Sequence, residues 1–266
     1  MCYTNKKDFS KEDAMSALER QEKIIELVSR NGSIQVERLA EILDVSQMTI
    51  RRDLDKLKAE GIVERKHGIA VIKEEVTYDE KMITRMAEKK SLAKVCASLV
   101  KPGDTIFLDS GTTIYEIAAL IKDIPDLTVI TNDIEIGFLL HKSKIELLIC
   151  GGFVQKETGS IYGSFANQMM NYIQTGIAFM GAMSIDNQFN ILTPTLDKAT
   201  LKRMIVKNAS KSYLVVDQSK FNRKALMKIN HMKDYTGIVT TRKFTGEEMK
   251  RIKEQEIHLI PVDETI

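Results

Sequence analysis

One stretch decides the fold of the N-terminal region: residues 46–61, which read SQMTIRRDLDKLKAEG. Ile50, Leu54 and Leu57 stand at positions i, i+4 and i+7, so they form one apolar stripe along a predicted helix. Ser46 precedes this stripe, and its hydroxyl is suited to cap the first turn. The rest of the helix surface is mainly basic and hydrogen-bonding, and it carries Met48, Thr49, Arg51, Arg52 and Lys56. The stretch therefore predicts a helix that packs through one side and offers a basic surface on the other.

The segments on either side of this helix complete a winged helix-turn-helix. Residues 16–30 and 36–43 have the apolar spacing of two further helices, and Asp44-Val45 forms the turn before the third. Residues 62–71 read as two short strands around a basic turn, which we interpret as the wing. Such a domain places its third helix in the major groove, where some side chains meet base edges and others neutralise phosphates. The predicted DNA contacts are Ser46, Gln47, Met48, Thr49, Arg51, Arg52, Lys56, Arg65, Lys66 and His67.

A solvated helix face is the alternative explanation for these basic residues. Arg51, Arg52 and Lys56 stand beside Asp53 and Asp55, an arrangement that is common on the surface of soluble proteins. The chain as a whole gives no further signal, because its 266 residues include 39 basic and 37 acidic ones and carry a formal charge of +2. The DNA-binding prediction therefore depends on three local features together: the capped helix pair, the paired arginines and the basic wing.

Residues 45–68, which read VSQMTIRRDLDKLKAEGIVERKHG, resemble the DNA-binding segment of DeoR-type bacterial repressors. Members of that family carry the pattern VSxxTIRRDLxxLxxxGxxxRxHGG. This chain departs from the pattern at Ile69, where the family has its last glycine, and the departure affects the tip of the wing. The resemblance implies a winged helix-turn-helix that binds double-stranded operator DNA.

The second region has a different rhythm, in which short apolar runs alternate with longer amphipathic stretches. Continuous apolar runs are typical of strands covered on both faces, and their alternation with helical segments predicts a mostly parallel sheet. The predicted strands are Thr105–Leu108, Leu127–Ile130, Glu146–Cys150, Ile177–Met180, Tyr213–Val216, Gly237–Val239 and His258–Ile260. We therefore predict an α/β protein in four parts: a tail at 1–15, a winged helix-turn-helix domain at 16–73, a linker at 74–90, and an effector and oligomerisation domain at 91–266.

A candidate anion site follows the first of these strands, at Asp109-Ser110-Gly111-Thr112-Thr113. This small-residue turn opens the predicted helix 114–121, so it exposes backbone amides beside the positive end of the helix dipole, and its hydroxyls add donors. Sugar phosphates and nucleotides are natural occupants of such a turn. Simple helix capping is the alternative, because many strand-to-helix turns use Gly-Thr only for that purpose.

Several other predicted strands also end in small or polar residues. Ligands of open parallel sheets bind beyond the carboxyl ends of the strands, so this rim predicts a site for a small polyhydroxy anion. The candidate effector contacts are Asp109, Ser110, Gly111, Thr112, Thr113, Thr131, Asn132, Gly151, Gly152, Lys202, Asp217 and Lys220. The plainer alternatives are a tight turn for the glycine pair, a helix cap for Asp217, and ordinary surface positions for the two lysines.

The order of motifs in this region resembles the effector domain of the same DeoR-type family. FLDSGTT, a Thr-Asn pair, a Gly-Gly pair, GSFA, FMGA and VVDQSKF follow one another as they do there, so the similarity spans about residues 16–241. The resemblance implies the fold of ribose-phosphate isomerases and CoA-transferases, with a sugar phosphate at the loop 109–113. This chain departs twice, with Lys198 where the family usually has Glu and Thr241 where it often has Asp. A lysine at this rim makes the site more cationic, which favours a more highly phosphorylated ligand or none.

Three functions remain open at this point. The first, which we expect, is a repressor of sugar or related carbon metabolism genes, controlled by a phosphorylated sugar metabolite. It would act as a homo-oligomer, a dimer or tetramer, because two recognition helices must match a palindromic site. The second is a sugar-phosphate isomerase with Asp109 or Asp217 as its base, although a helix-turn-helix has no use in such an enzyme. The third is a DNA-binding oligomer with an empty effector pocket.

The composition argues against other classes. Cys2, Cys96 and Cys150 lack the spacing of a disulfide framework or a zinc site, and the four histidines are scattered, so we expect no metal and no cofactor. No apolar run reaches the roughly 18–20 residues that span a bilayer, and the N-terminus has no signal-like apolar segment. We therefore expect a cytoplasmic protein without a membrane partner.

Overall fold

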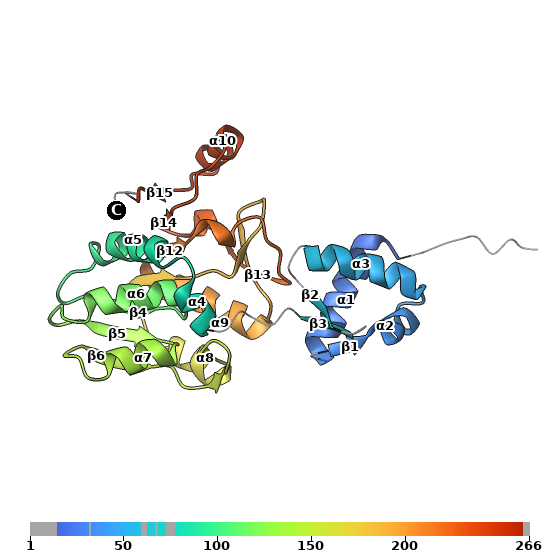
Figure 1. Cartoon of the computed structure of the whole chain (residues 1–266). Helices are drawn as coiled ribbons and strands as arrows, with labels where there is room; N and C mark the ends of the chain where they lie inside the picture. Colours follow the sequence, from blue (N-terminus) through green and yellow to red (C-terminus); the bar gives the residue numbers. More distant parts are fainter. Residues whose placement is uncertain (1–14, 32, 60–62, 67–68, 73–77, 263–266) are drawn as a thin grey trace, which may run out of the picture. The chain divides into compact units, whose positions relative to one another are not determined.

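The computed structural model describes residues 15–31, 33–59, 63–66, 69–72 and 78–262. The chain forms two compact units that divide between Lys73 and Glu74. Figure 1 draws the N-terminal unit in blue and the C-terminal unit from teal to red. Most of the predicted tail, the wing residue His67 and the start of the predicted linker lie outside the described residues.

The N-terminal unit is a winged helix-turn-helix, as predicted. Its elements are α1 (Ala17–Asn31), β1 (Ser33–Gln35), α2 (Val36–Ile42), α3 (Gln47–Ala59), β2 (Val63–Lys66) and β3 (Ile69–Ile72). The strands pair antiparallel in the order β1-β3-β2, so β2 and β3 form the predicted wing hairpin, and β1 adds a strand that the sequence did not reveal. Ile50, Leu54 and Leu57 of α3 are fully buried with apolar side chains of α1 and α2, which confirms the apolar stripe.

The C-terminal unit is built on a parallel sheet of seven strands, as the apolar runs predict. The strands are β4 (Thr105–Leu108), β5 (Thr128–Thr131), β6 (Glu146–Ile149), β9 (Thr175–Met180), β12 (Ala209–Val216), β14 (Gly237–Thr240) and β15 (Leu259–Ile260). Their order across the sheet is β15-β14-β12-β9-β4-β5-β6, with every neighbouring pair parallel. All seven predicted strands are therefore members of one sheet.

Helices cover both faces of this sheet. They are α4 (Tyr78–Ile83), α5 (Met86–Ala97), α6 (Thr112–Ile121), α7 (Ile134–Leu140), α8 (Ser164–Met170), α9 (Leu196–Asn208) and α10 (Gly246–Glu254). Ile106 and Leu108 of β4 pack into one core with side chains of α5, α6 and α7. Phe107 points to the other face, where the core takes side chains of α8, α9 and α10. Burial on both faces explains why an inner strand such as β4 reads as a continuous apolar run.

In its described part, the C-terminal unit also contains two small antiparallel sheets beside the main sheet. They contain β7 (Phe153–Val154) with β8 (Ile161–Tyr162), and β10 (Ser184–Ile185) with β11 (Asn190–Thr193) and β13 (Met227–His231). Short 3-10 turns follow at Gln218–Lys220 and Met232–Asp234. The sequence did not predict these strands, because most of them are too short to show an apolar rhythm of their own.

The direction in which the chain adds strands reverses once. From β4 the chain moves outward to β5 and β6, then places β9 on the other side of β4 and continues through β12, β14 and β15. The reversal therefore lies between β4 and β9. In open parallel sheets, the crevice beyond the carboxyl ends of the strands at such a point is where ligands bind.

The predicted linker is shorter than expected. Residues 78–90 belong to α4 and the start of α5, which are part of the C-terminal unit. The backbone amide of Tyr78 donates to the carbonyl of Glu157, and Leu92 on α5 is fully buried in the core. The high charge of this stretch, which suggested a linker, instead reflects basic side chains that face a cavity. Within the described part of the chain, no helix is long and apolar enough to cross a lipid bilayer.

Candidate functional site

Helix α3 presents the predicted DNA-binding surface. Met48 is 64% exposed, and Arg51, Arg52 and Lys56 are exposed with it. The Ser46 hydroxyl accepts the backbone amide of Thr49 at 3.1 Å, so the predicted cap is present at the start of the helix. The predicted contacts of this helix therefore lie on one face, opposite the buried stripe.

Asp53 does not balance the arginines beside it. Its side chain is buried, its Oδ2 accepts the Arg20 guanidinium at 2.6 Å, and its Oδ1 accepts the Gln21 amide at 3.1 Å. Both partners belong to α1, so this carboxylate ties α1 to α3 within the domain. Asp53 is therefore committed to α1, whereas Asp55 is exposed on the same helix as Arg51 and Arg52. In the wing, Arg65 and Lys66 lie on β2.

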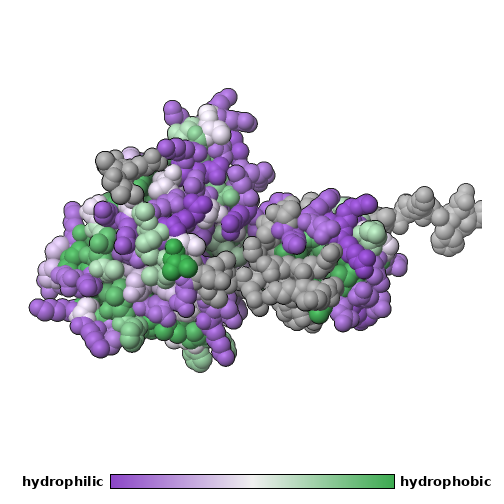
Figure 2. Space-filling model, viewed as in Figure 1, coloured by the Kyte–Doolittle hydropathy of each residue, from purple (hydrophilic) through white to green (hydrophobic). Residues whose placement is uncertain are grey.

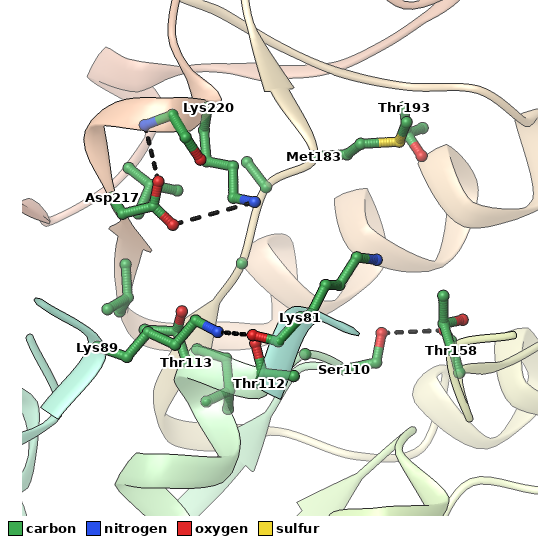
Figure 3. A pocket seen from close by; sticks show the side chains of 18 of the residues that line it. Lys81, Lys89, Ser110, Thr112, Thr113, Thr158, Met183, Thr193, Asp217 and Lys220 are labelled. Carbon is green, nitrogen blue, oxygen red and sulfur yellow. Dashed lines mark hydrogen bonds and ion pairs between the residues drawn. The ribbon is translucent and has the colours of Figure 1, made fainter. Parts of the chain in front are cut away.

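A cavity of about 410 Å³ opens in the C-terminal unit at the reversal of strand order, and Figure 3 shows it from close by. Its wall contains the residues that follow β4, from Ser110 to Thr113, and Gly181, which follows β9. Asp217 and Lys220 join from the segment after β12, and α4, α5 and α9 supply further side chains. The volume lies in the range of about 300–1,000 Å³ that is usual for small-molecule sites.

The N-terminus of α6 opens into this cavity. Gly111 has φ +143°, a conformation that favours glycine, and α6 starts directly after it without a side-chain cap from the described residues. The amides of Thr112 and Thr113 belong to the first turn, which has no intrahelical acceptors. The Ser110 hydroxyl reaches Ser160 Oγ at 2.9 Å. The loop therefore has the geometry of the predicted anion site, with helix amides and hydroxyls on one wall.

Asp133 holds this loop in place, and the sequence did not identify it. Its Oδ2 accepts the Gly111 amide at 3.0 Å, while its Oδ1 accepts the amides of Glu135 and Ile136 and so caps α7. The side chain is fully buried, and burial together with the nearby charge of Asp109 raises its pKa to about 6. One carboxylate thus connects the ends of two neighbouring strands.

Asp109 lies behind the cavity wall rather than in it. It is fully buried, and its Oδ2 accepts the Gly181 amide at 2.9 Å and also pairs with the Lys202 ammonium. Lys202 donates in addition to the carbonyl of Gly181 at 3.1 Å and lines the cavity. The Lys202 ammonium is therefore held at the cavity wall by Asp109 and Gly181, while Asp109 itself does not line the cavity.

Asp217 is a turn cap that also faces the cavity. Its Oδ1 accepts the Ser219 amide at 2.7 Å, and its Oδ2 lies 4.0 Å from the Lys220 ammonium, as Figure 3 shows. Asp217 therefore both caps the turn and lines the cavity wall. Both carboxylates considered as isomerase bases are engaged by groups of the chain itself.

Seven basic side chains line the cavity: Lys81, Arg85, Lys89, Lys198, Lys202, Lys220 and Arg223. Lys89 is buried, donates to the carbonyl of Lys81, and has its pKa lowered by burial and by the charge of Lys220. The sequence identified Lys202 and Lys220 as contacts and Lys198 as a rim position, but it missed the other four. Lys81, Arg85 and Lys89 are spaced by four residues, and this regular spacing of basic residues is a signal in the sequence that could have identified them.

Besides Asp109, four predicted effector contacts do not line the cavity. Thr131 is buried and donates to the Leu108 carbonyl at 2.8 Å, and the Asn132 amide donates to the Ile161 carbonyl at 3.3 Å. Gly151 and Gly152 are exposed, and a Cβ on Gly152 would lie 2.4 Å from the Tyr162 carbonyl, so this glycine serves the close approach to β8. Thr131 ends β5, Asn132 follows it, and the two glycines lie after β6; both strands lie beyond β4 and away from the reversal. Thr241, one of the two departures from the family pattern, donates a hydrogen bond from its hydroxyl to Glu88. Glu88 also forms an ion pair with Arg85 at 3.1 Å.

The two units together define a winged helix-turn-helix joined to an α/β domain with a basic cavity. The chain matches the family models described as the DeoR-like helix-turn-helix domain, over residues 20–76, and the DeoR C terminal sensor domain, over residues 84–242. It belongs to the DeoR family.

Similar proteins include named repressors. The lactose phosphotransferase system repressor of Lactococcus lactis subsp. lactis is 34% identical, over 79% of this chain and 85% of the relative. The protein of the same name from Staphylococcus aureus (strain NCTC 8325 / PS 47) is 31% identical, over 85% of this chain and 92% of the relative. Among solved structures, ribose 5-phosphate isomerase A from Methanocaldococcus jannaschii is 22% identical, covers 50% of this chain and 53% of that chain, and has a TM-score of 0.36.

Proposed function

We propose that this protein is a transcriptional repressor of sugar metabolism genes, and that a phosphorylated sugar metabolite controls its affinity for operator DNA. One observation carries the proposal: a cavity at the reversal of strand order combines an uncapped helix N-terminus with seven basic side chains. Helix amides and cations in one enclosed space suit a phosphoryl group. The names of the lactose phosphotransferase system repressors support a sugar as the signal.

DNA binding is assigned to the exposed face of α3 and to the wing. Ser46, Gln47 and Thr49 lie at the start of the helix, where side chains reach base edges, and Arg51, Arg52 and Lys56 follow along the same exposed face. Arg65 and Lys66 on β2 are further candidate contacts, and the predicted contact His67 lies outside the described residues. Arginine suits both tasks, because its planar fork pairs with guanine or with phosphate.

Control of DNA binding requires two states of the protein that differ in operator affinity. The metabolite must bind one of these states better, and a coupling of about 1–3 kcal/mol changes operator affinity about 5- to 150-fold. Two copies of the domain on a palindromic operator provide such states, because a change in their spacing moves both recognition helices at once.

The second copy would bind an apolar surface at the β6 edge of the sheet. Phe138 on α7, Phe153 on β7 and Phe165 on α8 are between 67% and 72% exposed. Gly163, which precedes α8, brings its backbone close to the Phe153 ring, and Figure 2 shows apolar residues along this side of the unit. An exposed apolar patch on a protein of this kind is typical of an interaction surface. A closed homo-oligomer of two or four copies would cover it.

Fluorescence anisotropy with operator DNA tests the proposal. The operator is first selected from a random duplex library with the full-length protein, and its binding is then measured with and without a panel of sugar phosphates at fixed salt, because salt alone changes affinity strongly. We expect at least one sugar phosphate to change operator affinity several-fold, while the unphosphorylated sugar has no effect. Failure to select any sequence would overturn the repressor assignment, and selection without any response to phosphorylated sugars would overturn the sensor assignment.

A further inference from the structure

Helix α4 is a short and lightly packed element beside the cavity. It has six residues, of which Tyr78 and Lys81 line the cavity wall and Ile83 is 81% exposed. The side chains of Tyr78, Lys81 and Met82 are half-buried rather than buried. A helix of this length is marginal by itself, so its stability depends on its contacts with neighbouring elements.

Contacts at both ends attach α4 to the rest of the C-terminal unit. At its start, the Tyr78 amide donates to the Glu157 carbonyl at 2.8 Å, and the Tyr78 ring lies edge-on to the Tyr115 ring of α6. At its end, the Lys89 ammonium donates to the Lys81 carbonyl, as Figure 3 shows. Lys89 belongs to α5, so this hydrogen bond joins the end of α4 to the next helix.

The Lys81 carbonyl has other donors besides Lys89. The amide and the hydroxyl of Thr84 also donate to it, at 3.3 Å and 3.1 Å. A carbonyl oxygen has two lone pairs, so three donors exceed what it accepts well. Lys89 can therefore leave this oxygen without creating an unsatisfied acceptor, because the bonds from Thr84 remain.

The surroundings of the Lys89 ammonium favour an anion over this carbonyl. Lys89 is buried, and it lines the same cavity as the first turn of α6. Burial and the charge of Lys220 lower its pKa, and the charges of Asp217 and Glu116 offset this only in part. An ammonium also binds a phosphate oxygen more strongly than a neutral carbonyl, because both partners are then charged. A phosphoryl group at the start of α6 would therefore draw Lys89 away from α4.

The junction between α4 and α5 borders the same cavity. Arg85 directly precedes α5 and has φ +52°, a left-handed conformation that is disfavoured for residues other than glycine. Its guanidinium pairs with Glu88 at 3.1 Å, and Arg85 itself lines the cavity. Such a conformation persists because the surrounding contacts hold it, so the junction is a suitable hinge when one of those contacts is lost.

We propose that Lys89 is the residue that transmits occupancy of the cavity to the DNA-binding unit. Its ammonium moves from the Lys81 carbonyl to the bound phosphoryl group, and α4 thereby loses its attachment to α5. Helix α4 is the first element after the division between Lys73 and Glu74, so its stability decides how firmly the chain from the DNA-binding unit is attached. This inference rests on the proposed function, because it names how the same cavity regulates DNA binding.

Hydrogen exchange measured by mass spectrometry tests this inference in the full-length protein. The probe is inorganic phosphate, with ionic strength held constant by chloride, and its binding is followed separately by phosphorus NMR. The wild type is compared with three variants. K89M keeps a long side chain that cannot donate, K89R keeps the charge and the donors, and K220Q removes a cavity lysine on the segment after β12.

Without phosphate, we expect α4 to exchange equally slowly in the wild type, K89R and K220Q. In K89M it should exchange about fivefold faster, the size expected when one hydrogen bond between helices is lost. Saturating phosphate should raise exchange of α4 in the wild type and K89R to the rate of K89M, and it should leave K89M unchanged. K220Q should respond like the wild type at a higher phosphate concentration.

The α5 segment around the fully buried Leu92 is the internal reference, and phosphate should not accelerate its exchange. If this reference shows that K89M is unfolded, the response of wild-type α4 to phosphate decides the question. Phosphate that binds the wild type without accelerating exchange of α4 would overturn the role of Lys89 and leave the sensor in place. Absence of phosphate binding would overturn the sensor itself, so the two failures are distinguishable.

Operator binding provides a second readout by fluorescence anisotropy. K89M without ligand is expected to bind the operator as the wild type does when saturated with the most effective sugar phosphate of the panel. This expectation holds whether that sugar phosphate strengthens or weakens DNA binding. A K89M protein that binds the operator like the ligand-free wild type, and still responds to the sugar phosphate, would contradict the inference.

Discussion

The two units of this protein use positive charge in opposite ways. On α3, Arg51, Arg52 and Lys56 are exposed on a convex face, and the buried Asp53 is committed to Arg20 of α1. In the C-terminal unit, Lys89 and Lys198 are buried at the wall of a cavity, and Lys202 is fixed by Asp109 and Gly181. Exposed cations suit a long, hydrated polyanion, whereas buried and oriented cations suit a small one that fits inside.

The difference between these two surfaces indicates how each of them gains its binding free energy. Each exposed cation interacts through water, so its individual contribution is small and falls with salt. A cation at the wall of a cavity is less hydrated and less screened, so each of its contacts with a small anion contributes more than a contact at the surface. DNA binding should therefore vary with salt more steeply than effector binding, and damage to the fold of one unit should spare the other.

Core truncations should separate the two units most strongly. Leu54 is 1% exposed in the N-terminal core and Leu140 is 0% exposed in the C-terminal core, so replacing either by alanine costs about 2–5 kcal/mol in its own unit. L54A is expected to lose operator binding and keep sugar phosphate binding, and L140A to weaken sugar phosphate binding first. Calorimetric melting with both binding assays measures this. Equal loss of both activities in L54A would mean that the units do not fold independently.

The pH dependence of stability should single out the C-terminal unit. The folded pKa of Asp133 is about 6, above its ordinary value of 3.8, so the folded state holds a proton that the unfolded state releases. Stability from this group is therefore present at low pH and is lost as pH rises from about 4 to about 6, at up to about 1.4 kcal/mol per pH unit.

The comparison variant is D133N, which cannot titrate. The free energy of unfolding of the wild type minus that of D133N is expected to fall by up to about 3 kcal/mol across this window. Chemical denaturation at a series of pH values measures the difference. A difference that stays constant with pH would show that Asp133 is ionised without strain in the folded unit.

Removing one recognition arginine should have a smaller effect that is confined to DNA. R52A is expected to weaken operator binding by about 1–3 kcal/mol and to relax specificity, if Arg52 reads a base. R38A is the control, because Arg38 on α2 is also exposed and pairs with Glu41 at 2.8 Å. Anisotropy against matched and mismatched duplexes measures both variants. Unchanged specificity in R52A would reassign Arg52 to the phosphate backbone.

Helix caps should give the smallest effects and still distinguish the two units. Ser46 caps α3, as the sequence predicted, and Thr245 caps α10 in a capping box with Glu248. Replacing either by alanine is expected to cost about 1 kcal/mol of stability. Only S46A should also lower operator affinity, because Ser46 lies at the start of the recognition helix. Thermal unfolding and anisotropy test the pair, and an effect of T245A on DNA binding would contradict the division.

Much of the fold was predictable because the signals are local. All seven apolar runs became strands of one parallel sheet, and inner strands such as β4, β5 and β9 are buried along most of their length, which favours apolar side chains. The small sheets were not predictable, because strands such as β7, β8 and β10 contain two residues each. The length of the linker was overestimated, because the many charged residues at 78–90 suggested an exposed segment. Three of its basic side chains, Lys81, Arg85 and Lys89, instead line the cavity.

The candidate site was predictable only in part. Ser110, Gly111, Thr112 and Thr113 line the cavity as expected, but Asn132 and Gly151 at other strand ends do not. The sequence shows where each strand ends but not which strands are neighbours in the sheet, so all strand ends looked equally suitable for the site. Asp133, which sets the shape of the loop, was hidden because a carboxylate after a strand also fits an ordinary helix cap.

The amino-acid order by itself determined the recognition helix and the small-residue loop before α6. Both depend on residues within a few turns of each other, where helical periodicity and glycine geometry act directly. The tertiary structure alone decided that β9 pairs with β4, and hence that residues after β4, β9 and β12 meet around one space with lysines from α4, α5 and α9. Strand order is set by how whole helices pack across the sheet, and no local stretch of sequence records it.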